Sequence, residues 1–256
     1  MRYILTGEQM RYADAYTIEK MGVPSMVLME RAALSVVKTL EDEKADLRRA
    51  LIVCGSGNNG GDGLAIARLL FLKGLEPEVW YLGNLKNASE ENKMQYKIAD
   101  NYGVSIRNTF EEKEYSVIID CIFGTGLKRK VEGAYKTAIE QLNGLSAVKV
   151  SVDIPSGISD TTGQIWGTAF KADITVCLAF EKLGTVLFPG AEYAGRKYVT
   201  DIGIAESALQ EERRFYTYEP EDRYSLLPKR KENSHKGSYG KVLMIAGSKG
   251  MAGAAF

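Results

Sequence analysis

Three short segments combine glycines with polar side chains directly after runs of apolar residues. They are GSGNNGGDG at 55–63, DCIFGTGLKRK at 120–130 and DIPSG at 153–157. Glycines let backbone N–H groups come close to a phosphate group, and the amide and carboxyl side chains can hold a polar ligand or a cation. These segments are therefore the candidate functional site.

The first segment satisfies the pattern G-x-G-x-x-G through Gly55, Gly57 and Gly60. This pattern is typical of the dinucleotide-binding turn of dehydrogenases, which also carry an acidic residue near the end of the second strand to bind a ribose. Here the second apolar run, PEVWYLGN, has Glu78 near its beginning and ends without a carboxylate. A dehydrogenase is therefore disfavoured, while a glycine turn that only packs tightly, with Asp62 as a cap, is the structural alternative.

Side chains of the first segment set it apart from a dehydrogenase turn, because Asn58, Asn59 and Asp62 can hydrogen-bond to a polar ligand. After Asp62 the apolar residues recur at helical spacing as far as Gly74, which predicts a helix with a glycine C-cap. The amino end of this helix should face the ligand, where free N–H groups favour phosphate.

The second segment predicts a phosphate cradle. Asp120 lies within its apolar run, and GTG is followed closely by Lys128, Arg129 and Lys130. Backbone N–H groups next to cations suit a phosphate group. A solvated loop whose basic residues contact nothing is the alternative.

The third segment holds the best candidate for proton transfer. Asp153 follows the strand-like run KVSV, and Pro155 and Gly157 give a turn in which the chain can approach a ligand closely. Because His235 is the only histidine, a Ser-His-Asp triad and a histidine-based zinc site are disfavoured. We therefore predict that Asp153 is the acid/base residue, with a turn cap as the structural alternative.

A cation site is also indicated. Asn59, Asp120 and Ser156 offer only oxygen ligands, with one formal negative charge between them. Hard cations prefer oxygen, but a divalent ion usually gathers more carboxylates. The sequence therefore favours a monovalent ion at this site over a divalent one.

The elements that must position these segments follow from the apolar pattern. Two helical patterns cover residues 7–40, and short apolar runs then alternate with further helical patterns. These runs are ALIVCG, PEVWYL, YSVIIDCIFG, AVKVSVDIP, ADITVCLAF and RKYVTDIGI. Such alternation is typical of a mostly parallel sheet with helices on both faces, in which ligands bind beyond the carboxyl ends of the strands. We therefore predict an α/β fold that gathers all three segments at one edge of the sheet.

The composition excludes several classes of partner. Lysine plus arginine equals aspartate plus glutamate, at 33 each in 256 residues, so no overall field favours nucleic acid or anionic lipid. No uncharged apolar run reaches the length of about 18 residues that spans a membrane, and the N-terminus lacks the apolar core of a signal peptide. We expect a cytoplasmic protein that acts on a small molecule and binds neither nucleic acid nor a membrane.

The three segments together resemble the NAD(P)H-hydrate epimerase family, the amino-terminal domain of the YjeF type. MERAA at 29–33, GSGNNGGDGLAIAR, DCIFGTGLKRKVEGAY and SVDIPSG occur in the family's order and approximate spacing. The resemblance implies a Rossmann-like three-layer α/β/α sandwich, usually a homodimer. It also implies a role in cofactor repair, in which the enzyme interconverts the R and S forms of hydrated NADH or NADPH.

The resemblance assigns roles residue by residue. The substrate-binding residues are Asn58, Asn59, Gly60, Gly61 and Asp62, the phosphate loop Gly124, Thr125, Gly126, Leu127, Lys128, Arg129 and Lys130, and the acidic residue Asp153. A potassium ion is implied at Asn59, Asp120 and Ser156. A non-catalytic nucleotide-sensing or protein-binding module on the same fold is the alternative function, and Asp153 disfavours it because such a module needs no acid.

The end of the chain differs in character. We divide the sequence into an epimerase domain at 1–217 and a linker with a further segment at 218–256, where KVLMIAGSKG predicts a new strand and glycine turn. NSHKGSYGKVLMIAGSKGMAGAA resembles the start of an ADP-dependent NAD(P)H-hydrate dehydratase domain of ribokinase-like fold. The later motifs of that domain are absent, so we expect a truncated fragment without dehydratase activity.

Overall fold

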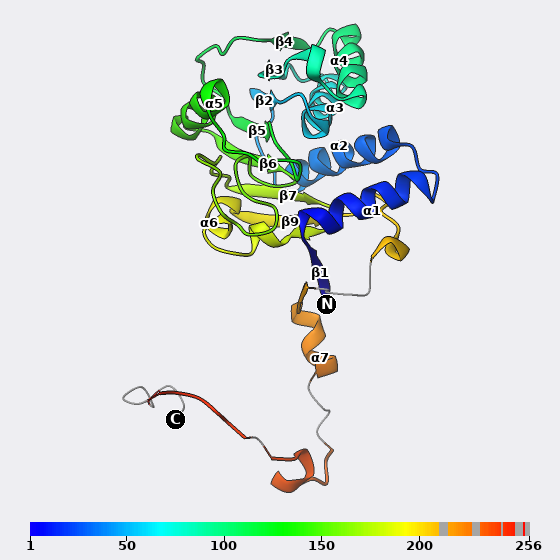
Figure 1. The fold of residues 1–256 in the computed structure, drawn as a ribbon, viewed down its shortest axis with the longest axis vertical. Helices are drawn as coiled ribbons and strands as arrows, with labels where there is room; N and C mark the ends of the chain where they lie inside the picture. Colours follow the sequence, from blue (N-terminus) through cyan, green and yellow to red (C-terminus); the bar gives the residue numbers. More distant parts are fainter. Residues whose placement is uncertain (210–214, 227–230, 242, 249–252, 254–256) are drawn as a thin grey trace. The chain divides into compact units, whose positions relative to one another are not determined.

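A seven-stranded sheet forms the centre of the computed structural model, which describes residues 1–209, 215–226, 231–241, 243–248 and 253 (Figure 1). Its strands are β2 (Ala50–Cys54), β3 (Glu78–Tyr81), β4 (Ser105–Arg107), β5 (Val117–Cys121), β6 (Val148–Val152), β7 (Ile174–Leu178) and β9 (Arg196–Thr200). They lie in the order β4-β3-β2-β5-β6-β7-β9, and every neighbouring pair is parallel. The predicted α/β class is confirmed, and so are all six predicted strands.

The central strands are apolar on both faces because helices cover the sheet from both sides. In β2, Ile52 and Cys54 contact one core cluster, while Leu51 and Val53 contact the other. Side chains of a strand alternate between faces, so a strand buried on both faces becomes a continuous apolar run. These continuous apolar runs are the pattern from which the strands were predicted.

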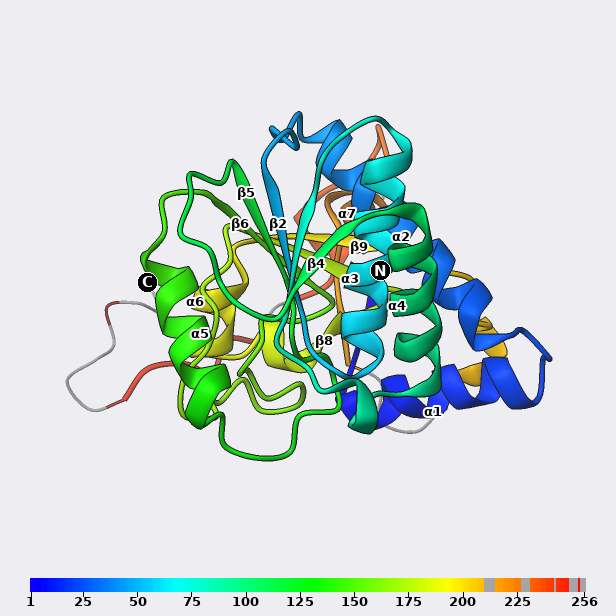
Figure 2. The same cartoon turned by 90° about the horizontal axis from the view of Figure 1, so that it is seen from above.

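Two groups of helices form the outer layers. The helices are α1 (Gly7–Glu19), α2 (Ser25–Asp42), α3 (Asn58–Leu72), α4 (Glu90–Tyr102), α5 (Gly133–Gly144) and α6 (Gly190–Ala194). Figures 1 and 2 show α2, α3 and α4 on one side of the sheet and α5 and α6 on the other. Among the described helices, none combines the length and the apolar character needed to cross a bilayer.

The chain before α1 pairs with a distant segment. The short strand β1 (Arg2–Leu5) runs parallel to β8 (Glu181–Lys182), with Ile4 opposite Glu181 and Leu5 opposite Lys182. Helix α1 begins directly afterwards with a capping box, in which Thr6 and Gln9 bond each other's backbone N–H groups. This pairing, which the apolar pattern did not predict, fixes where α1 starts.

The structure divides into two compact units, Tyr3–Phe215 and a second unit of Met1–Arg2 with Tyr216–Phe256. The second unit contains the short helix α7 (Arg223–Leu226). The strand predicted near its end is not formed in the described residues, because 243–248 have no regular secondary structure and Leu243 and Ile245 are exposed. An isolated strand has no partner for its backbone groups, which explains this result. Val242 and most of the predicted glycine turn lie outside the described residues.

Candidate functional site

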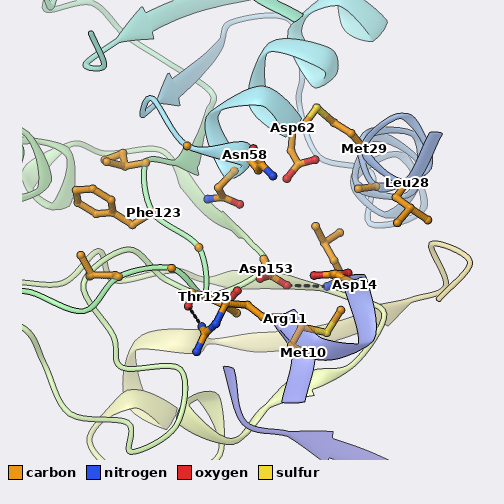
Figure 3. Close-up of a pocket in the computed structure, with 18 of the residues that line it drawn as sticks. Met10, Arg11, Asp14, Leu28, Met29, Asn58, Asp62, Phe123, Thr125 and Asp153 are labelled. Carbon is orange, nitrogen blue, oxygen red and sulfur yellow. Dashed lines mark hydrogen bonds between the residues drawn. The ribbon is translucent and has the colours of Figure 1, made fainter. Parts of the chain in front are cut away.

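A cavity of about 710 Å³ lies at the carboxyl ends of β2, β5 and β6 (Figure 3). The strand order reverses between β2 and β5, and such a switch point is where open parallel sheets bind ligands. Helices α1 and α2 complete the wall. The lining residues include Met10, Arg11, Asp14, Leu28, Met29, Gly57, Asn58, Asn59, Asp62, Phe123, Gly124, Thr125, Gly126, Leu127, Lys128, Arg129, Tyr135 and Asp153.

The first segment is more helical than predicted. Helix α3 begins at Asn58 rather than after Asp62, so NNGGDG forms its first turns and only GSG is a turn. Glycines are poor helix formers, but here packing requires them: a Cβ at Gly60 would lie 1.9 Å from the Gly55 carbonyl oxygen. A Cβ at Gly63 would lie 2.7 Å from the Cys54 sulfur. Close packing of α3 on β2 and β5 thus overrides helix propensity.

A buried amide holds the GSG turn in place. Asn92 of α4 donates from its Nδ2 to the carbonyl oxygens of Gly55, at 3.0 Å, and Gly57, at 2.8 Å. Its Oδ1 accepts a hydrogen bond from the Tyr81 hydroxyl group at 2.8 Å. Asn92 is fully buried, so every one of these bonds is shielded from water. The amino end of α3 is therefore fixed next to the cavity.

Asp153 lies at the end of β6 in a left-handed backbone conformation, with φ of 72°. Its carboxylate forms an ion pair with Lys182 of β8 and accepts a hydrogen bond from the Leu178 backbone N–H at 3.3 Å. Lys182 is fully buried and also donates to the Leu178 carbonyl oxygen at 2.7 Å. A buried ammonium needs such partners, and a non-glycine residue at positive φ is common at functional sites. Sequence analysis predicted Asp153 but not Lys182.

Two further carboxyl groups face the same cavity. Figure 3 shows Asp62 reaching into it from α3, while Asp14 of α1 lies beside Asp153 on the opposite wall. Burial raises the pKa of Asp14 to about 7, with the Asp153 charge adding to the rise and the Lys182 charge opposing it. Burial also raises the pKa of Asp62, and the charges of Asp153 and Asp14 add to this effect.

The second segment forms one rim of the cavity, from Gly124 to Arg129. Arg11 of α1 donates to the carbonyl oxygen of Thr125 (Figure 3). It also forms an ion pair with Asp160 at 3.1 Å. The contact ties this loop to α1 and places a third cation beside Lys128 and Arg129. A rim with several cations and free glycine N–H groups can hold the phosphates of a nucleotide.

The three predicted potassium ligands meet around Phe123 and Gly124. The Ser156 hydroxyl contacts both the N–H group of Phe123, at 2.8 Å, and its carbonyl oxygen, at 3.2 Å, and donates to Asp120 at 2.6 Å. A Cβ at Gly124 would lie 3.4 to 3.6 Å from atoms of the Asn59 side chain.

The chemistry of these three residues fits a monovalent cation. The Asp120 carboxyl is fully buried, and burial raises its pKa to about 6 although Ser156, Ile122 and Ser151 donate hydrogen bonds to it. A buried carboxylate without a cationic partner is stabilised by a cation. Among the described residues, no group of three or more His, Cys, Asp or Glu side chains is arranged to hold a metal ion, which disfavours a divalent site.

The predicted residues fall into two sets. Most of them line the cavity, whereas Gly60, Gly61, Asp120, Lys130 and Ser156 are not part of its wall. Gly61 packs against the Met29 side chain, and Gly60 packs against Gly55 and Asn92. Their assignment to substrate binding stays a prediction, and the structure adds a packing role.

Asp14, Lys182 and Arg11 are the residues that sequence analysis missed. Met10, Asp14 and Ile18 line the cavity at steps of four residues, which is one face of α1. An acidic residue on this otherwise apolar face was the available signal. For Lys182 the signal was a lysine within the apolar run AFEKLGTVLF.

Comparisons with known proteins identify the family of this chain. The family described as YjeF-related protein N-terminus matches residues 25–184. A curated NAD(P)H-hydrate epimerase of Oenococcus oeni is 43% identical over 204 residues, which cover 79% of this chain and 97% of that protein. An NAD(P)H-hydrate epimerase of Limosilactobacillus fermentum is 45% identical over 198 residues, with 77% and 95% covered.

A longer relative and a solved structure extend the comparison. The bifunctional NAD(P)H-hydrate repair enzyme Nnr of Thermofilum pendens is 36% identical over 256 residues, covering 96% of this chain but 48% of that enzyme. The crystal structure of yeast ynu0 has the same fold, with a TM-score of 0.65 at 23% identity, covering 77% of this chain and 86% of that one. On its sequence and fold, the chain belongs to the NAD(P)H-hydrate epimerase family, the YjeF-related N-terminal proteins.

Proposed function

We propose that this chain is an NAD(P)H-hydrate epimerase that interconverts the R and S forms of hydrated NADH and NADPH, with Asp153 as acid/base residue and a bound potassium ion. The observation that carries the proposal is the Asp153–Lys182 ion pair at the wall of a cavity whose other wall is the NNGGDG helix start. The name of the relatives supplies the substrate. The cationic rim supports binding of the dinucleotide phosphates.

The chemistry follows from the substrate. The hydrated ring carbon carries a hydroxyl group next to the ring nitrogen, so transfer of a proton to that hydroxyl lets water depart while the nitrogen stabilises the cation. Water then adds to either face and loses a proton. Asp153 takes part in these proton transfers as the acid/base residue, and Lys182 holds its carboxylate in place.

Potassium, when bound, supplies positive charge that stabilises polar groups of the substrate and of the protein. Asn59, Asp120 and Ser156 would hold it. These residues come from α3, β5 and the turn after β6, so their shared contacts around Phe123 and Gly124 keep the three segments in register. Replacement of potassium by a large organic cation should therefore lower turnover, which a titration with potassium chloride would check at constant ionic strength.

The direct test is to add the protein to unequal mixtures of the R and S hydrates and to follow them by chromatography. Asp153→Asn should lower kcat about 10²- to 10⁴-fold while NADPH still binds, because only the proton transfer is lost. Near-normal turnover of this variant would remove Asp153 from its role. No acceleration by the wild-type protein over the spontaneous rate would instead favour a nucleotide-sensing or protein-binding module.

Two chemical routes share this residue and can be separated. Departure of the hydroxyl group as water incorporates one ¹⁸O atom when epimerisation runs in H₂¹⁸O. A route that opens and recloses the ring beside the nitrogen keeps the original oxygen on its carbon. Mass spectrometry of the product after a short reaction distinguishes the two. The homodimer stays a prediction of the family resemblance, and the cytoplasmic location stays a prediction from the sequence.

A further inference from the structure

The Asp153–Lys182 ion pair raises a question about the first proton. As partner of a buried ammonium group, Asp153 is a carboxylate, and Lys182 has two acceptors, the Asp153 carboxylate and the Leu178 carbonyl oxygen. A carboxylate can accept a proton from incoming water, but it holds none for the departing hydroxyl group. A second group must therefore provide that proton.

Asp14 is positioned for this task. It lines the cavity from α1 and lies on the same wall as Asp153 (Figure 3). Packing fixes the position of Asp14, since the neighbouring Ala13 is fully buried. In addition, β1 immediately precedes α1 and pairs with β8, which places Leu5 opposite Lys182. The helix that carries Asp14 is thus connected through β1 to the strand that carries Lys182.

The surroundings of Asp14 differ from those of a structural carboxylate. Asp120, which holds its turn together and is the proposed potassium ligand, accepts hydrogen bonds from the N–H groups of Ile122 and Ser156 and from two hydroxyl groups. By contrast, no residue in the described part of the chain donates a hydrogen bond to the side chain of Asp14 or of Asp62. Their partners must come from water or from the substrate.

Charge balance leads to the same conclusion. Asp14, Asp62 and Asp153 face one cavity, and Lys182 is the cation among them that burial removes completely from water. The rim cations Arg11, Lys128 and Arg129 are more exposed, so three carboxylates against one buried ammonium leave an excess of negative charge among the more buried groups. This excess of negative charge favours the protonated forms of Asp14 and Asp62.

We propose that Asp14 is a second catalytic residue, which gives its proton to the hydroxyl group that leaves while Asp153 takes a proton from the water that adds. In the first step the C–O bond breaks, the electron pair goes to oxygen, and Asp14 becomes a carboxylate as water departs. In the second step water forms the new C–O bond and Asp153 becomes a carboxylic acid. The proton then returns from Asp153 to Asp14, so that no oxidant, reductant or net proton is needed. In the opposite direction the proton first moves from Asp14 to Asp153, which then protonates the departing hydroxyl group, while Asp14 takes a proton from the water that adds.

This inference rests on the proposed epimerase function, and Asp14→Asn tests it. The variant keeps the size of the side chain but cannot hold a transferable proton, so kcat should fall about 10²- to 10⁴-fold. NADPH, which has no hydroxyl group to lose, should bind within about threefold of wild type in a fluorescence titration. Asp14→Glu should restore part of the rate. Glu8→Gln, which removes an exposed carboxyl from the first turn of the same helix, is the matched control and should leave kcat unchanged.

The pH dependence gives a readout that a purely structural role would not change. Asp14 acts in its protonated form, and the groups that face it are Lys182, Asp153 and Asp62. Wild-type kcat should fall as pH rises through about 7, and the residual rate of Asp14→Asn should lack that fall.

The outcomes separate the two proposals. A wild-type protein without activity contradicts the epimerase function itself. An active wild type with an equally active Asp14→Asn variant overturns the role of Asp14 alone. Parallel loss of NADPH binding and turnover in Asp14→Asn, with both restored in Asp14→Glu, also overturns it, because Asp14 would then act in ground-state binding.

Discussion

At the scale of single residues, the site separates two kinds of aspartate. Asp120 is fully buried and saturated by hydrogen bonds from its own turn and its neighbour, so it organises the backbone. Asp153 meets one charged partner, and Asp14 and Asp62 face the cavity without protein donors in the described residues. Saturated carboxylates stabilise the fold, whereas carboxylates left for water or substrate destabilise it and are retained for chemistry.

Sequence alone singled out Asp153 and Asp120 as candidates, because Asp153 follows a clear apolar run and Asp120 lies within one. It could not identify Asp14 or Lys182 in the same way. Lys182 lies on β8, which pairs with β1 through a contact between segments about 177 positions apart, from Leu5 to Lys182. Local pattern does not contain such pairing, which depends on the whole fold.

Lys182 should matter for both turnover and stability. In Lys182→Met the Asp153 carboxylate loses its buried partner, so kcat should fall at least tenfold and the unfolding free energy at pH 8 by about 3 to 5 kcal/mol. The double variant Lys182→Met, Asp153→Asn should regain much of that stability without regaining turnover, because no unpaired charge remains. Chemical denaturation of the four proteins measures the coupling. Additive losses in the cycle would show that the two side chains do not interact.

At the scale of elements, the amino end of α3 is where sequence and structure differ most. Helix propensity placed the helix after Asp62, because glycine and asparagine are poor helix formers. Packing against Gly55, Asn92 and the two cysteines of β2 and β5 instead starts the helix at Asn58. Helix C-termini, by contrast, were predicted well, since Gly74 follows α3 at positive φ.

Substitution by alanine should have different effects at two glycines near the amino end of α3, Gly57 and Gly60. Gly57 has an extended backbone that any residue adopts, and an added Cβ would meet no atom within 4 Å. Because Gly57 lines the cavity, Gly57→Ala should leave Tm within about 2 °C of wild type but weaken NADPH binding at least fivefold. Gly60→Ala should lower the unfolding free energy by about 1 to 3 kcal/mol, because its methyl group collides with the Gly55 carbonyl. Equal effects of both variants on Tm would contradict this division.

At the scale of the whole molecule, the parallel topology explains why the position of the site could be predicted from the sequence although its detailed geometry could not. Strands β2, β5 and β6 are neighbours in the sheet, so the three glycine-containing segments that follow them meet at one edge. That part of the prediction needed only the order of apolar runs and helical patterns. The second unit could not be predicted equally well, since KVLMIAG is a strand-like pattern whose described residues form no strand.

Asp14 in the cavity should also make the stability of the protein fall as pH rises, which is opposite to acid denaturation. The folded protein raises the pKa of Asp14 from 3.8 to about 7, so between these values the folded state binds more protons than the unfolded state. Stability from this group is therefore lost as pH rises through about 7. Asp14→Asn removes this effect, so the variant should be more stable than wild type at pH 8. A pKa shift corresponds to about 1.4 kcal/mol per unit, and screening by solvent at this partly exposed group reduces the expected gain in unfolding free energy to about 1 to 2 kcal/mol.

A control of opposite sign is available at Asp46, where the neighbouring Arg48 lowers the pKa to about 2. The stabilisation from Asp46 is lost only as pH falls from 3.8 toward 2, so the Tm difference between Asp46→Asn and wild type should stay constant from pH 5 to pH 8. The difference between Asp14→Asn and wild type should instead grow over that range, as thermal unfolding monitored by circular dichroism can measure. If both differences stay constant, the Asp14 carboxyl is solvated like a surface group. If only the Asp14 difference grows while the variant has lost turnover, the protein sacrifices stability at this residue for function.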